Sequence, residues 1–360
     1  IGNQGDLALQ WHAYVEGADP DATPPGERGE VLTSLDVAAA VGEPDARVQA
    51  LTYARGHLWA VGRVGFDEPR LWQITPGGEL VATFPIGGVS SLGWRALATD
   101  GDHLYGTDTY TIAVWSLDQQ QVTDQIFTGS NNGTALAHDR DNGHFYQAGQ
   151  TGAITVLDRD GEEVRLIATP YAIAGLAWDD LSPGGPYLWA WIDGGDDAGD
   201  GSRCRAIRLD PISGQPTGVA FTGQDQGALP DVPGAATITR DLAPGRVALL
   251  GVQESADGGD ETAVVAYDLA TSLPPAWLDL VGGTLGDVAP DTVGVLTVAL
   301  HGTMADTTTA GVIRIGSNDP AQPLVEIPVS LAMLAAQTTT GVDGGDGAPP
   351  AVISAAGNHP

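Results

Sequence analysis

Short apolar strands alternate with turns rich in Gly, Asp and Pro along most of the chain, at a period of roughly 40 residues. In the first copy, the stretch VQALTYARG is followed by HLWAVGRV, RLWQITPGG and ELVATFPI, which together span residues 48–86. Further copies span residues 94–129, 133–170, 173–223 and 234–270, and the fifth copy lacks its last strand. Each copy therefore predicts a small antiparallel sheet of four strands.

Sheets repeated at this period are typical of the blades of a β-propeller, in which an incomplete blade leaves an open edge. The segment VLTSLDV (residues 31–37) matches the missing fourth strand, so we expect it to complete the fifth blade and close the ring. The predicted fold class is all-β, with a five-bladed propeller over residues 31–273. A six-bladed ring that also uses residues 7–15 is the alternative.

Strands are also predicted on both sides of the repeats. In DLALQWHAYVE (residues 6–16) every second residue is apolar, so Leu7, Leu9, Trp11, Ala13 and Val15 share one face of a strand. A Pro- and Gly-rich loop follows, and residues 1–30 are expected to form a separate N-terminal segment. Residues 274–334 predict a small immunoglobulin-like β-sandwich with an Asx-Pro turn at SNDP (Ser317–Pro320). Residues 335–360 predict a flexible tail, in which AVISA (residues 351–355) could form a short strand.

Charge narrows the range of partners. The net charge is −31, and the 15 basic residues are all Arg. Such a surface repels nucleic acid and anionic lipid. Either a high-salt environment or the base composition of the source genome explains the acidity. One cysteine excludes an internal disulfide, and no apolar run is long enough to span a bilayer. We expect a processed part of a longer protein, since the chain begins at Ile1.

Few residues suggest chemistry, because nucleophile elbows, CxxC pairs and nucleotide-binding glycine loops are all missing from the sequence. The loop DGGDDAGDG provides carboxylates on a turning backbone, which suits Ca²⁺, so the candidate metal ligands are Asp193, Asp196, Asp197 and Asp200. A solvated hairpin tip explains the same loop. Trp189 and Trp191 share one face of a strand, where they either pack in the core or form a shelf for a sugar or peptide.

Two resemblances add to this interpretation. The stretches GWRALATDGDHLYGTD (residues 93–108), IAGLAWDDLSPGGPYLWAW (residues 173–191) and IGSNDPAQPLVEIPVSL (residues 315–331) resemble a tandem of secreted bacterial proteins. In that tandem, a β-propeller precedes an immunoglobulin-like module. The resemblance implies export and a cell-surface context. The blade pattern DGDHLYGTD…IAVWSLD is also similar to that of five-bladed glutaminyl cyclase propellers, but no catalytic residue of that family can be assigned here.

Together these features predict an extracellular, non-catalytic structural or interaction protein. We expect a subunit of a cell-surface or filamentous assembly, built when the strand containing Leu9 and Val15 adds to the sandwich of another copy. The alternative is a glycan- or peptide-binding module of a larger secreted hydrolase. A third hypothesis, an enzyme of the cyclase type, would need a cluster of carboxylates and aromatic residues at the centre of the ring. Apart from Ca²⁺, no cofactor is expected.

Overall fold

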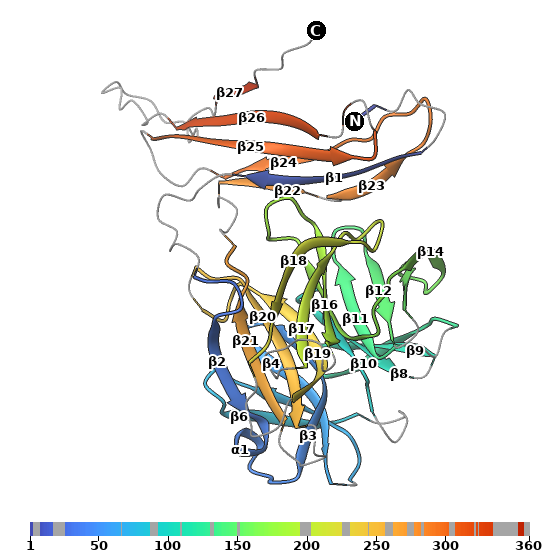
Figure 1. Ribbon diagram of the computed structural model, residues 1–360, viewed down its shortest axis with the longest axis vertical. Coiled ribbons are helices and arrows are strands. Elements are labelled where there is room, and N and C mark those ends of the chain that lie inside the picture. Colours follow the sequence, from blue (N-terminus) through green and yellow to red (C-terminus); the bar gives the residue numbers. More distant parts are fainter. Residues whose placement is uncertain are drawn as a thin grey trace, which may run out of the picture. The chain divides into compact units, whose positions relative to one another are not determined.

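Nearly all of the regular secondary structure in the computed structural model is β-strand (Figure 1). It describes the chain except for residues 3–7, 17–25, 66, 87–92, 109, 130–132, 150–151, 195–202, 225–230, 244, 256–261, 272–276, 282–283, 302–306, 320–321, 323, 334–351 and 356–360. By its internal contacts the chain divides into two units. A propeller-like unit contains Thr23–Asp179 and Tyr187–Thr271, and a two-sheet unit contains Ile1–Ala22, Asp180–Pro186 and Ser272–Pro360.

The propeller-like unit contains five antiparallel sheets of four strands each, one for each sequence repeat. The first sheet has the order β3 (Ala46–Ala54), β4 (His57–Val64), β5 (Arg70–Ile74) and β6 (Leu80–Pro85). The second contains β7 (Leu97–Thr99), β8 (His103–Asp108), β9 (Thr111–Ser116) and β10 (Gln121–Phe127). The third contains β11 (Ala135–Asp139), β12 (His144–Ala148), β13 (Ala153–Leu157) and β14 (Glu163–Ala168).

The last two sheets follow the same plan. The fourth contains β15 (Ile173–Asp179), β16 (Tyr187–Asp193), β17 (Cys204–Leu209) and β18 (Pro216–Thr222). The fifth contains β19 (Asp231–Thr239), β20 (Ala248–Ser255), β21 (Thr262–Asp268) and β2 (Val31–Asp36). β2 pairs antiparallel with β21, so the fourth strand of this sheet comes from the start of the chain.

The expected strand over residues 31–37 ends one residue early, because a short helix, α1 (Val37–Val41), follows it. The Asp36 side chain accepts a hydrogen bond from the Ala39 backbone N–H and caps the N-terminus of the helix. Gly42 ends the helix with a φ of 75°, a left-handed conformation that favours glycine. Val37 is fully buried by this turn.

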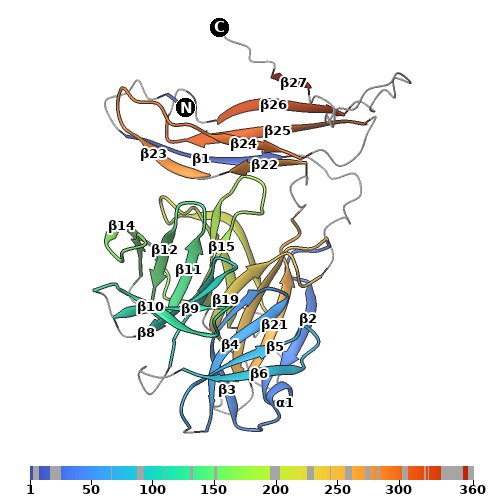
Figure 2. The ribbon, with the colours of Figure 1, turned by 180° about the vertical axis from the view of Figure 1, so that it is seen from behind.

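Neighbouring sheets pack face to face through buried side chains. Apolar clusters join the first sheet to the fifth, the first to the second, the second to the third, and the third to the fourth. Trp191 and Phe221 of the fourth sheet contact the ring of Tyr267 in the fifth. The innermost strands contact one another in the cyclic order β3, β7, β11, β15, β19 and back to β3. The sheets are thus arranged in the manner of a propeller (Figure 2).

The two-sheet unit has one sheet of five strands and one of two strands. The larger has the order β23 (Leu285–Val288), β1 (Leu9–Glu16), β25 (Thr307–Ser317), β26 (Leu324–Met333) and β27 (Val352–Ala355). The smaller contains β22 (Leu278–Val281) and β24 (Thr297–Leu300). Trp11, Ala13 and Val15 of β1 are buried against Trp277 and Leu278.

The organisation at the chain ends therefore differs from the expected domain boundaries. Residues 1–30 do not form a segment of their own, because Ile1–Ala22 group with the two-sheet unit and the propeller-like unit begins at Thr23. β1 pairs with β23 and β25 and with none of the four-stranded sheets, so it adds no sixth blade. In the expected tail, β27 pairs with β26. No helix among the described residues is long and apolar enough to cross a membrane.

Candidate functional site

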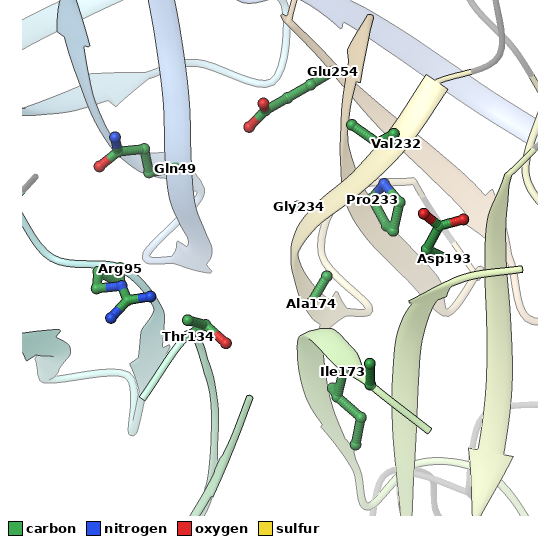
Figure 3. A pocket seen from close by; sticks show the side chains of 11 residues that line it. Gln49, Arg95, Thr134, Ile173, Ala174, Asp193, Val232, Pro233, Gly234 and Glu254 are labelled. Carbon is green, nitrogen blue, oxygen red and sulfur yellow. The ribbon is translucent and has the colours of Figure 1, made fainter. Parts of the chain in front are cut away.

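A pocket of about 570 Å³ lies in the propeller-like unit, and all five of its sheets contribute to the lining (Figure 3). This volume is in the range of sites that bind small molecules. The polar lining residues are Gln49, Arg95, Thr134, Asp193 and Glu254; the remainder are Ala172, Ile173, Ala174, Val232, Pro233 and Gly234. Most of them lie on or just before the innermost strand of a sheet.

The innermost strands can approach one another because small residues face the neighbouring sheet. A Cβ on Gly175 of β15 would lie 2.5 Å from the backbone nitrogen of Ala236 on β19. Only glycine permits so close a contact between two backbones. β19 also contains an irregularity between Pro233 and Ala236, which bends the strand beside the pocket.

Charges of both signs surround the pocket. Burial raises the pKa of the Glu254 carboxyl, and the nearby Arg47 guanidinium opposes this shift. Asp193 lies at the end of β16, where its carboxylate pairs with the guanidinium of Arg203. Arg95 points toward the cavity from the side opposite Asp193 (Figure 3). The pocket can therefore bind an anionic group at Arg95 and a hydrogen-bond donor or cation at Glu254.

Gln49 adds an unsatisfied acceptor. Its Oε1 atom is buried and has no hydrogen-bond partner among the described residues. A buried carbonyl oxygen without a partner is costly, typically by about 1–3 kcal/mol. The side chain would have to turn toward the pocket before a ligand or water could donate to this atom.

Gln49, Arg95, Thr134 and Glu254 are not among the site residues predicted from the sequence. A signal for three of them is present in the repeats, in the aligned segments VQAL (48–51), WRAL (94–97), GTAL (133–136) and IAGL (173–176). The second residue of each segment lines the pocket: Gln49, Arg95, Thr134 and Ala174. Polar residues at this position mark the inner surface of the ring.

The structure places only one of the four predicted metal ligands. Asp193 is described and pairs with Arg203, whereas Asp196, Asp197 and Asp200 lie outside the described residues. Among the described residues no group of three or more His, Cys, Asp or Glu side chains could hold a metal ion. Binding of Ca²⁺ to the acidic loop stays a prediction.

The two tryptophans of β16 belong to the core and form no exposed shelf. Trp189 and Trp191 are 1% and 0% exposed. The Trp189 indole N–H donates to the Asp179 carboxylate at 2.8 Å, and that of Trp191 donates to the Val252 carbonyl at 3.1 Å. Both rings are therefore out of reach of a sugar or a peptide.

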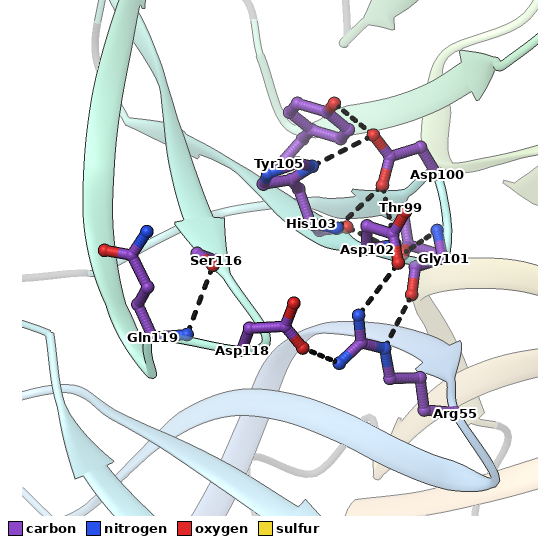
Figure 4. Close-up of polar contacts among 10 residues, drawn as sticks. All are labelled: Arg55, Thr99, Asp100, Gly101, Asp102, His103, Tyr105, Ser116, Asp118 and Gln119. Atoms are coloured by element: carbon purple, nitrogen blue, oxygen red, sulfur yellow. Dashed lines mark hydrogen bonds and ion pairs between the residues drawn. The ribbon is translucent and has the colours of Figure 1, made fainter.

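A second polar cluster joins the first two sheets (Figure 4). Arg55 donates to Asp102 at 2.8 Å and to Asp118 at 2.5 Å, and both carboxylates are exposed. Asp100 accepts hydrogen bonds from the Tyr105 hydroxyl at 2.7 Å and from the His103 backbone N–H at 2.7 Å. Although burial opposes it, these bonds lower the pKa of Asp100 to about 2. The cluster is a closed network of contacts between sheets, so we assign it a structural role.

The residues expected to form an exchanged strand lie mostly in β1. Leu9, Trp11, Ala13 and Val15 face the core of the two-sheet unit, and Leu7 lies outside the described residues. The sequence predicts that this strand adds to the sandwich of another copy, but in the structure it lies inside the sheet of its own chain, between β23 and β25.

Comparisons with known proteins give the following results. No protein-family model matches the chain, and no curated protein matches it. Among solved structures, the crystal structure of glutaminyl cyclase from Myxococcus xanthus is similar, with 16% sequence identity and a TM-score of 0.47. The match covers 66% of this chain and 96% of that protein.

This comparison corrects one expectation. Because the sequence contains no catalytic motif, we predicted from it that the chain is no enzyme. The similar solved structure is that of an enzyme, so the prediction of a non-enzyme is wrong as it was stated. In a propeller, the lack of a catalytic sequence motif says little about catalysis, because the residues at the centre come from distant repeats.

Proposed function

We propose that this chain is an extracellular interaction protein that binds a peptide in the pocket lined by Arg95 and Glu254. In this proposal the four-stranded sheets are the blades of a five-bladed propeller, and the two-sheet unit is an immunoglobulin-like sandwich. The observation that carries the proposal is that all five sheets contribute to one pocket with charges of both signs. Propeller scaffolds commonly bind their ligands at such a central position.

The chemistry of the lining favours a peptide over a glycan. A peptide offers N–H donors for the Glu254 carboxyl, and carbonyl or carboxylate oxygens for Arg95. Sites for sugars usually present an aromatic face, but none of the lining residues that the structure describes is aromatic. The alternative expected from the sequence, a module of a larger secreted hydrolase, is compatible with the same pocket.

The test measures binding of a library of short peptides and, in parallel, a set of oligosaccharides, by calorimetry on the full chain. Arg95→Gln should weaken peptide binding roughly tenfold to a hundredfold, since it removes a charge-assisted hydrogen bond. Glu254→Gln should also weaken it. Arg70→Gln and Glu79→Gln are the matched controls, because these residues lie outside the pocket lining.

Three results would count against the proposal. Binding of oligosaccharides alone would replace the peptide with a glycan. Peptide binding unaffected by Arg95→Gln would place the site elsewhere. If neither library binds, the pocket is not a binding site for these classes.

A further inference from the structure

β1 occupies a slot in its sheet that only a strand can fill. It pairs antiparallel with β25 from Trp11 to Glu16 and with β23 from Leu9 to His12. Among the described strands β23 has no other partner in this sheet. Without β1, the sheet would separate into β23 alone and the strands from β25 onward, with unpaired backbone groups on both sides of the gap.

The walls of the slot match the side chains of β1. Trp11 lies opposite Gly286, where a Cβ would come within 3.3 Å of the indole ring. His12 lies opposite Gly316, where a Cβ would come within 2.5 Å of the imidazole. Aromatic rings that cover glycines on a neighbouring strand fix the register of a sheet. The slot is therefore specific for this segment.

The turn after β25 makes two hydrogen bonds to the start of β1. The Gln10 backbone N–H donates to the Asn318 side-chain oxygen at 3.0 Å, and the Asn318 backbone N–H donates to the Gln10 carbonyl at 3.1 Å. Asn318 belongs to the SNDP segment that the sequence singled out as a turn. This segment thus also recognises β1.

β1 is joined covalently to the other strands of its sheet only through the long polypeptide segment between them. The propeller-like unit lies between β1 and the rest of its sheet in sequence, and Cys204, the one cysteine, forms no disulfide. A second copy of the chain would present an identical β1 and an identical slot. Exchange of such an element preserves every contact and is a low-cost route to association.

We propose that the β1 slot is an interface between copies of this chain, in which β1 of one copy fills the slot of another. The low charge of β1 favours its exchange between copies. The chain carries a net charge of −31, but within β1 the only acidic residue is Glu16. The inserted strand therefore brings little of the repulsion that opposes contact between acidic surfaces. Unlike addition to an open edge, this exchange leaves no slot empty.

The experiment traps an exchanged strand with a disulfide. Tyr14 and Arg314 are direct partners across the β1–β25 pair, at a spacing that suits a disulfide. Two chains are produced together in one cell with different tags, Tyr14→Cys on one and Arg314→Cys on the other, both with Cys204→Ala. A control pair combines Tyr14→Cys with Gln125→Cys, because Gln125 lies on β10 of the propeller-like unit, outside the slot.

Exchange predicts that a disulfide-linked species carrying both tags forms with the Arg314→Cys partner and not with the control. Its mass should be twice that of the 36.9-kDa chain. A single chain that carries Tyr14→Cys and Arg314→Cys together shows whether the disulfide can form at all. If this chain closes its disulfide internally and the paired chains give no mixed species, β1 stays in its own chain and the proposal is overturned.

Discussion

At the residue scale, His138 shows how burial couples stability to pH. Its ring lies between Tyr105 and Phe145, with centroids 4.9 and 4.8 Å away, and its buried Nδ1 has no hydrogen-bond partner within the part of the chain that the structure describes. Burial lowers the pKa of His138 to about 4, although the Asp100 carboxylate opposes the shift. In the unfolded chain a histidine takes up a proton near pH 6.5. Stability is therefore lost as the pH falls from about 6.5 to about 4.

Replacement of this histidine should reduce the sensitivity to acid. We expect His138→Phe to remove about 3 kcal/mol of the loss in unfolding free energy between pH 7 and pH 4. Urea unfolding at both pH values measures the difference. His301→Gln is the control, because His301 is exposed, and it should behave as the parent chain does. A His138→Phe chain that loses as much stability as the parent would show that this ring does not titrate as described.

At the element scale, the two faces of β1 have unequal importance. Trp11, Ala13 and Val15 are 6%, 1% and 8% exposed, whereas His12 and Tyr14 point to the other face and are only partly buried. The alternation in the sequence predicted both faces, because a strand with one buried side has a period of two. Its partners could not be predicted, because β23 and β25 lie far along the sequence.

This asymmetry leads to a direct comparison of two variants. Trp11→Ala should destabilise the two-sheet unit by about 3–5 kcal/mol, as expected when a large buried side chain is removed. Tyr14→Ala should cost much less. Thermal unfolding, followed by circular dichroism, gives both values. Equal, small effects of the two substitutions would mean that β1 does not pack in this sheet.

Other parts of the fold were harder to predict from the sequence. The repeats predicted four strands per sheet because apolar residues and turns recur at a fixed spacing. Helix α1 was missed, since VAAAV (37–41) is too short to show helical periodicity and depends on the Asp36 cap. The pocket was missed for another reason. Gln49, Arg95 and Glu254 lie far apart in sequence, and only the packing of the sheets brings them to one place.

At the scale of the whole molecule, two segments close to the N-terminus complete two different units. β1 fills the larger sheet of the two-sheet unit, and β2 is the fourth strand of the fifth four-stranded sheet. The apolar cluster between the first and fifth sheets includes Val37 and Val264 and depends on this closure. Strands taken from both ends of a repeat array remove an open edge and tie the ends together.

A disulfide across this closure should stabilise the propeller-like unit. Thr33 and Ala266 are direct partners in the β2–β21 pair. With Cys204→Ala, the pair Thr33→Cys and Ala266→Cys should raise stability by about 2–4 kcal/mol when oxidised, because the bridge constrains the unfolded chain. Calorimetric scans with and without reductant measure the gain. A disulfide that fails to form in the folded chain would contradict the pairing of β2.

The same closure sets the order in which the protein can fold as it is synthesised. β1 and β2 leave the ribosome well before their partners, because β21 begins at residue 262 and β25 at residue 307. At roughly 5–20 residues per second, the early strands wait on the order of ten to sixty seconds for their partners. During that time Trp11 and its apolar neighbours have no native surface to cover them. The larger sheet of the two-sheet unit therefore stays incomplete until β25 has emerged, which leaves the nascent chain open to chaperones during that time.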